Sequence, residues 1–154
     1  MTLLFPLLAL ASTTAVPKPS VVVPVNVCDS ALRRQVEQRF FAVDGRWEVL
    51  SSERCEYMGD GGRVTIRYGR SKTVLDPRNE FAALRKAFPD ARARDLREAG
   101  VAGIVLDLDD SGTQVFAVAG EHEYLMVSVL GFGEPARVSG VAEGLARGAL
   151  KAIR

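Results

Sequence analysis

The sequence is poor in the residues that most enzymes use for chemistry, and it has no long apolar run at its start. It contains one histidine, one tryptophan and two cysteines among 154 residues. Because there is a single histidine, any imidazole-based mechanism has to use His122. The apolar run at residues 3–11 is far shorter than the ~20 residues that span a bilayer. This run is therefore not expected to be a transmembrane helix.

Motifs of common catalytic and phosphate-binding sites are also missing. No Cys-x-x-Cys pair is present, and no serine stands in a Gly-x-Ser-x-Gly context. Gly61-Gly62 and Gly131-x-Gly133 do not precede Lys-Ser or Lys-Thr, so both are expected to be turns. The pI near 7.8 gives no indication of the concentrated basic patch that nucleic-acid binding needs. The sequence therefore predicts a non-enzymatic chain without cofactor, metal ligand set or nucleic-acid partner.

Residues 1–11 are typical of a signal peptide. Their apolar run ends in Ala9-Leu10-Ala11, which fits the small-x-small cleavage pattern, and Thr13-Thr14-Ala15 offers a second site. No Lys or Arg precedes the run, so a buried N-terminal strand or helix is the alternative. No cysteine follows directly, and no stable membrane anchor is expected. The interpretation places the protein in the periplasm or outside the cell.

Cys28 and Cys55 are the two cysteines of the chain. In an exported protein an even cysteine count predicts a disulfide, because oxidising compartments form such bonds. The bridge would close a loop of about 28 residues and stabilise the fold by roughly 3–4 kcal/mol. The alternative is a pair of reduced thiols, one of them nucleophilic.

The chain divides into the signal peptide, an extended proline-containing tether at 12–27, and one domain at 28–154. Alternation of apolar and polar residues predicts strands at 46–51, 54–58 and 63–69, and three more strands are expected at 104–107, 113–119 and 123–130. Helices are expected at 31–41, at 77–88 and from about residue 139 onward. The charged residues 91–103 are expected to form a connection. The predicted class is α+β, an antiparallel sheet of about six strands packed by three helices in the order α-βββ-α-βββ-α.

Two of these helices have clear sequence signals. Asp76 can cap the second helix, with Pro77 at its first position. Its apolar stripe is expected to be Phe81, Leu84 and Phe88. The buried side of the C-terminal helix is expected to comprise Val141, Leu145, Ala149, Ala152 and Ile153.

The order of these features resembles a family of small exported bacterial domains of unknown function with a PsbP-like α/β sandwich. The resemblance rests on a cysteine before the first helix, Cys55-Glu56-Tyr57 in a strand, a Gly-Val-Ala-Gly turn at 100–103 and a closing helix. It covers about residues 28–154. Many members are lipoproteins, but the lipid-attachment cysteine is absent here. The resemblance implies a binding or accessory domain.

Charge is distributed unevenly along the chain. Residues 33–97 contain 15 basic and 10 acidic side chains, whereas residues 98–135 contain seven acids and no Lys or Arg. An exported domain of this kind is expected to bind a partner protein or small ligand through electrostatic complementarity. The candidate binding surface comprises Asp107, Asp109, Asp110, Glu121, His122 and Glu123, with the arginine-rich face as the alternative.

Two other interpretations of this acidic region stay open. Residues 107–112 place oxygen-bearing side chains at positions 1, 3 and 5 and glycine at 6, as in an EF-hand loop, but Val118 occupies the position of the bidentate Glu. The flanks are strand-like and not helical, so a β-hairpin turn with acidic ends is the simpler explanation of the stretch. The second interpretation is a metal-assisted or His-dependent hydrolase that uses His122 with Asp107, Asp109 or Glu121.

Overall fold

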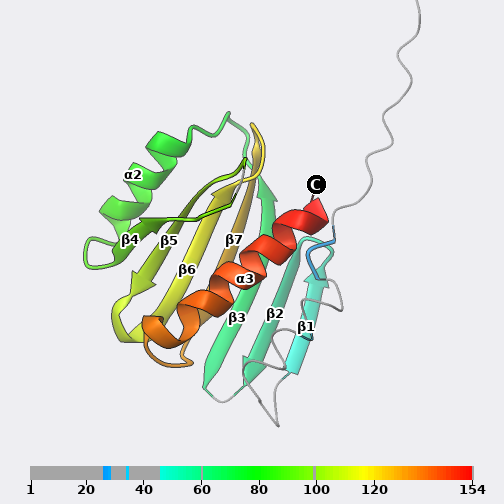
Figure 1. The fold of residues 1–154 in the computed structure, drawn as a ribbon. Coiled ribbons are helices and arrows are strands. Elements are labelled where there is room, and N and C mark those ends of the chain that lie inside the picture. The colour runs from blue at the N-terminus through cyan, green and yellow to red at the C-terminus, as the bar shows by residue number, and fades with distance from the viewer. Residues whose placement is uncertain (1–25, 29–33, 35–45, 60, 99, 154) are drawn as a thin grey trace, which may run out of the picture.

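The part of the chain that the structure describes forms a seven-stranded antiparallel sheet with helices on both faces. The computed structural model describes residues 26–28, 34, 46–59, 61–98 and 100–153. In this part of the chain the strand order is β1-β2-β3-β7-β6-β5-β4 (Figure 1). The strands are β1 (Arg46–Ser51), β2 (Arg54–Gly59), β3 (Gly62–Arg70), β4 (Arg92–Asp95), β5 (Ala102–Leu108), β6 (Gly112–Val118) and β7 (Glu123–Leu130). The helices are α2 (Pro77–Ala87) and α3 (Pro135–Ile153), and a 3-10 turn, η1 (Asp109–Ser111), joins β5 to β6.

The predicted order of six strands and three helices is wrong. The described residues form three strands, a helix, four strands and a helix. The missed strand is β4, whose Arg-Ala-Arg-Asp sequence was expected to be a connection. It forms because its backbone pairs with the edge of β5, and charged residues are common on edge strands, where they discourage further pairing. The predicted first helix, 31–41, lies outside the described residues except for the helical Arg34.

The main core lies between the sheet and α3, which runs across the face seen in Figure 1. Alternate residues of the central strands point to this face, as the two-residue period of a strand requires. Tyr57, Ile66 and Leu125 are at most 1% exposed, as is Leu145 of α3. Val27, directly before Cys28, is also fully buried in this cluster.

The register of α3 differs from the prediction. The buried residues of the helix are Val138, Ala142, Leu145, Ala146, Ala149 and Leu150. Val141 and Ile153 are partly buried, and Ala152 is exposed. Small residues on several sides of this helix make its apolar stripe ambiguous, and the packing surface of β5, β6 and β7 decides which side is buried.

The opposite face of the sheet is only partly covered by α2. Asp76 caps this helix, since its carboxylate accepts a 3.0 Å hydrogen bond from the backbone N–H of Arg78. The ring of Phe81 packs edge-on against Phe116, with centroids 6.5 Å apart. The helix has no fully buried residue. Phe88, predicted to join its apolar stripe, lies at its C-cap and is 38% exposed.

Gly140→Ala is expected to raise the free energy of unfolding by about 0.5–1 kcal/mol. Gly140 is exposed within α3, and a β-carbon at this position would meet nothing within 4 Å. Alanine loses less backbone entropy than glycine when a helix forms. Urea unfolding of the two proteins measures the difference. A loss of stability would show that the glycine has a packing role.

Candidate functional site

The six residues predicted to form one binding surface lie at two opposite ends of the sheet. Asp107, Asp109 and Asp110 are at the η1 end, where β5 turns into β6. Glu121, His122 and Glu123 are at the other end of β6, in the turn that leads into β7. The seven residues of β6 at ~3.3 Å each separate the two groups by about 20 Å. The structure therefore does not bring His122 together with Asp107 or Asp109.

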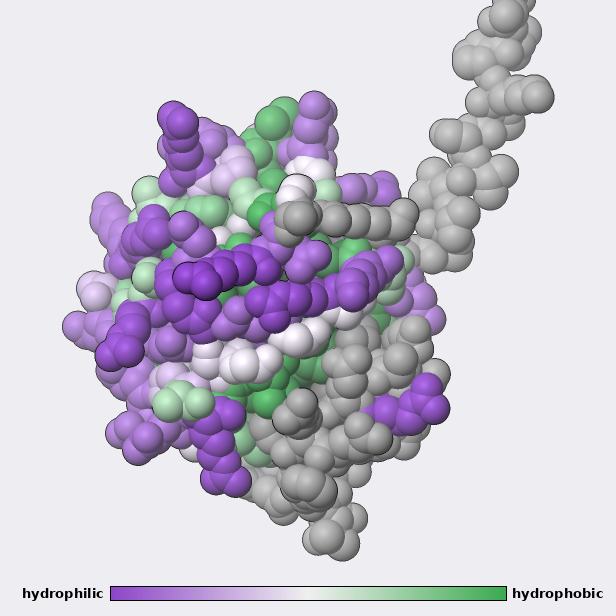
Figure 2. All heavy atoms as spheres, viewed as in Figure 1, coloured by the Kyte–Doolittle hydropathy of each residue, from purple (hydrophilic) through white to green (hydrophobic). Residues whose placement is uncertain are grey.

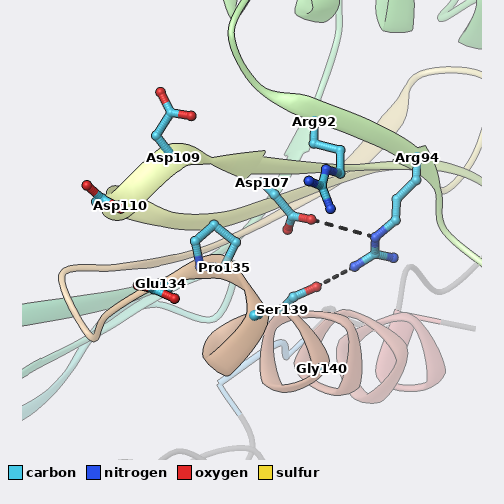
Figure 3. A pocket seen from close by; sticks show the side chains of 10 residues that line it. Arg92, Arg94, Asp107, Asp109, Asp110, Glu134, Pro135, Ser139 and Gly140 are labelled. Carbon is cyan, nitrogen blue, oxygen red and sulfur yellow. Dashed lines mark hydrogen bonds and ion pairs between the residues drawn. The ribbon is translucent and has the colours of Figure 1, made fainter.

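At the η1 end the structure forms a cavity of about 460 Å³, here named the charged pocket. It lies between the β4–β5 edge and the first turn of α3 (Figure 3). Its lining residues are Arg92, Arg94, Asp107, Asp109, Asp110, Glu134, Pro135, Ala136, Ser139 and Gly140. Hydrophilic side chains also predominate on the surface around α2, β4 and the start of α3 (Figure 2). The site is thus built from three segments that are far apart in the sequence.

Arg94 is the centre of a charged network at the floor of this pocket. Its guanidinium lies 3.8 Å from the Asp107 carboxylate and 2.5 Å from the Glu143 carboxylate of α3. It also donates a hydrogen bond to the Ser139 hydroxyl (Figure 3). Asp107 accepts a further hydrogen bond of 3.0 Å from the Thr113 hydroxyl. These contacts connect the edge strand β4 to both β5 and α3.

Glu143 extends the network along α3. Its second carboxylate oxygen lies 3.0 Å from the Arg147 guanidinium, which is 3.6 Å from Glu98. The Glu143 side chain is 13% exposed, whereas those of Arg94 and Arg147 are 38% and 37% exposed. A carboxylate shielded between two arginines is screened less by solvent than a surface ion pair. The network therefore fixes the position of α3 against β4.

Glu143→Ala is expected to lower the free energy of unfolding by about 1–3 kcal/mol, the usual worth of hydrogen bonds to charged groups. Arg94 would keep Asp107 and Ser139, but Arg147 would keep only longer contacts, with Glu98 and with the backbone carbonyl of Arg97. Urea unfolding measures the loss. Glu48→Ala is the matched control, because its 3.5 Å pair with Arg46 is well exposed and should contribute less than about 1 kcal/mol. Equal losses for the two variants would contradict the structural role of the network.

Arg92 differs from Arg94 in having no acidic partner among the described residues. It stands directly opposite Asp107 in the β4–β5 register. The Asp107 carboxylate is nevertheless directed to Arg94 and Thr113. Figure 3 shows Arg92 pointing toward the pocket, whereas the carboxylates of Asp109 and Asp110 point away from the two arginines. A guanidinium is therefore left in the pocket with its hydrogen-bond donors available.

The first turn of α3 adds a second source of positive potential to this pocket. Pro135 begins the helix and has no backbone N–H, and the N–H of Arg137 donates a 2.9 Å hydrogen bond to the Glu134 carbonyl. The positive potential therefore comes from the aligned peptide dipoles of α3, whose N-terminal end carries partial positive charge. Glu134, which precedes the helix, is exposed at the rim. The pocket consequently has Arg92, Arg94 and the Asp107 carboxylate that pairs with Arg94 on its inner side, and further carboxylates at its edge.

The His122 end of the sheet is organised differently. His122 and Glu121 are exposed, and their backbone carbonyls accept 2.7 Å hydrogen bonds from the N–H groups of Ser71 and Leu75. Glu123 lies 3.3 Å from the guanidinium of Arg70. Burial raises the pKa of the Tyr68 hydroxyl, and a hydrogen bond with Glu123 raises it further. The backbone carbonyls of Glu121 and His122 thus hold the segment before α2 in place.

The two cysteines lie at disulfide distance on the α3 face of the sheet. Cys28 and Cys55 are bonded, with their Cα atoms 5.7 Å apart. The backbone N–H of Val27 donates a 2.9 Å hydrogen bond to the carbonyl of Ser52, which places the incoming segment against the β1–β2 turn. The predicted cysteine pair is confirmed by this geometry.

The region considered as a calcium loop forms the β5–β6 hairpin turn. Asp107 lies near the end of β5, opposite Thr113 in the antiparallel register, and η1 makes the turn that joins β5 to β6. Asp109 has a φ of 39°, in the left-handed region that few residues other than Gly, Asn and Asp adopt. Over the described part of the chain, no three His, Cys, Asp or Glu side chains are grouped so as to hold a metal ion.

Comparisons with protein-family models, with curated proteins and with solved structures give no match to this chain. Within the residues that the structure describes, no helix combines the length and apolar character needed to cross a membrane.

Proposed function

We propose that this chain is an exported, non-enzymatic domain that binds a partner protein or small ligand in the cell envelope or outside the cell. The charged pocket is its contact site. The observation that carries the proposal is Arg92, a guanidinium that faces the pocket without an acidic partner among the described residues. An anionic group of the partner would pair with Arg92 beside the first turn of α3.

The mixed charge of the pocket narrows the chemistry of the partner. Asp109, Asp110 and Glu134 line its outer part and are exposed. A simple anion would meet repulsion from these carboxylates, whereas a group with both signs of charge would complement the inner arginine and the outer acids. The best fit is therefore a zwitterionic ligand or a protein segment in which acidic and basic side chains are close together.

The proposal that the chain is exported rests on separate observations. The signal-like residues 1–11, the bonded cysteine pair and the resemblance to small exported PsbP-like domains all favour export. The hydrolase alternative is weakened, because β6 separates His122 from Asp107 and Asp109 by about 20 Å. The version of the hydrolase hypothesis that remains would use the exposed side chains in the turn around His122.

A photo-crosslinking residue at position 136 tests the contact site directly. Ala136 is exposed and lines the charged pocket. Ala82 is the matched control, because it is exposed on α2 and lines neither this pocket nor the one described below. In cells that export the chain, irradiation should give a defined adduct from position 136 only, and Arg92→Gln should abolish it. The same adducts from both positions, or an adduct that survives Arg92→Gln, would refute the charged pocket as the contact site.

A further inference from the structure

A second cavity lies on the other side of η1 and differs from the charged pocket in its chemistry. It has a volume of about 470 Å³, within the usual range of small-molecule sites, and is here named the apolar pocket. Its lining residues are Ala87, Phe88, Pro89, Asp90, Ala91, Leu108, Asp109, Ser111 and Leu130. The two cavities share Asp109 alone.

The apolar wall of this pocket comes from both the sheet and the end of α2. Leu108 and Leu130 stand on either side of Gly112 in the strand register, and Gly112 places no side chain between them. Phe88 adds an aromatic ring that is 38% exposed, although phenylalanine is usually buried. This surface suits an apolar ligand body of about the size of one aromatic ring.

The charges around the apolar pocket are negative. Asp90 and Asp109 are both exposed and contribute its charged side chains, and no Lys or Arg lines it. The Asp109 carboxylate points away from Arg92 and Arg94 (Figure 3). The C-terminal end of α2, at Ala87 and Phe88, adds backbone carbonyls that carry partial negative charge. Arg85 and Lys86 lie in the same last turn but outside the lining.

From this combination we infer that the apolar pocket binds a small organic amine: an apolar body with a terminal ammonium group. The body packs on Phe88, Leu108 and Leu130. The ammonium lies between the Asp90 and Asp109 carboxylates. This site goes beyond the proposed function and does not depend on it, because its charged groups and its ligand differ from those of the charged pocket.

Titration of the full, disulfide-bonded chain with three probes of matched shape tests the inference by NMR. 4-Phenylbutylamine should give saturable shifts in the amide signals of Phe88, Leu108, Ser111 and Leu130. The neutral 4-phenylbutanol should bind about ten-fold more weakly, and the anionic 4-phenylbutanoate should give no saturable shifts. Equal affinity for the amine and the alcohol, or no saturation by the amine, would overturn the inference.

Variants of the two adjacent aspartates separate this site from the charged pocket. Asp109→Asn and Asp90→Asn should each raise the Kd of the amine by about three- to ten-fold. Asparagine tolerates the left-handed backbone at position 109, so the turn should be kept. Asp110 and Arg92 line only the charged pocket. The variants Asp110→Asn and Arg92→Gln should therefore leave the Kd of the amine unchanged. If these two variants weaken the amine as much as Asp109→Asn does, the amine binds in the charged pocket and the inference fails, whatever the crosslinking result at position 136.

Discussion

Gly112→Ala should lower the free energy of unfolding by about 3–5 kcal/mol. The glycine is buried directly after η1 with a φ of 127°, a conformation that L-residues rarely adopt. An added β-carbon would lie 2.1 Å from the backbone carbonyl oxygen of Val129. Since that oxygen belongs to the neighbouring strand β7, relief of the clash requires the hairpin to move. The strain and the overpacking each cost about 1–3 kcal/mol.

Urea unfolding of Gly112→Ala beside Gly61→Ala separates these two contributions. Gly61 also has a positive φ, 78°, but a β-carbon there would meet nothing within 4 Å. Its variant should lose only about 1–2 kcal/mol, the cost of the left-handed backbone. Similar losses for the two variants would show that β6 and β7 are not held as closely at η1 as the structure describes. Gly112→Ala should also abolish amine binding, since Leu108 and Leu130 flank this position.

Cys28→Ser is expected to lower the free energy of unfolding by about 3–4 kcal/mol under oxidising conditions. The bond joins residues 27 positions apart, and opening it increases the conformational entropy of the unfolded chain. The partner Cys55 is fully buried, so its thiol would stay inside the core. Denaturant unfolding with and without reductant measures the effect. The variant and the unmodified chain should have the same stability in reductant, and a difference that persists there would assign the loss to packing of residue 28.

Local sequence signals predicted the strands that have a clear apolar pattern, but they missed the strand that forms through pairing with its neighbour in the sheet. The six predicted strands coincide with observed ones to within one or two residues, and buried and more exposed residues alternate most clearly along β3. Strand β4 has no such alternation of apolar residues and is defined by its hydrogen bonds to β5. The buried side of α3 was equally unpredictable, since glycine and alanine occupy much of its surface.

The candidate site was also only partly predictable from the sequence. Asp107, Asp109 and Asp110 were predicted as surface residues near a turn, and they line the charged pocket. Arg92 and Arg94 were not predicted, because the Arg94–Ser139 contact joins residues 45 positions apart. Grouping His122 with these acids overlooked hairpin geometry: successive turns of an antiparallel meander lie at opposite ends of the sheet. That separation could have been predicted from the strand lengths alone.

The two pockets at the η1 end of the sheet differ in the charged groups that line them. The charged pocket combines Arg92 and Arg94 with four acidic residues at the first turn of α3, whereas the apolar pocket has two carboxylates, no Lys or Arg, and the last turn of α2. Opposite helix ends carry opposite partial charges. A change at Arg92 should therefore affect only the first pocket, and a change at Asp90 only the second.

Export is the central claim, because the compartment decides which partners and ligands the pockets can meet. Intact mass of the chain recovered from cells, with and without reductant and alkylation, tests it most directly. The account predicts a mass lacking residues 1–11 or 1–15, with Cys28 and Cys55 unreactive until reduced. A full-length mass with two free thiols would contradict export and the disulfide together.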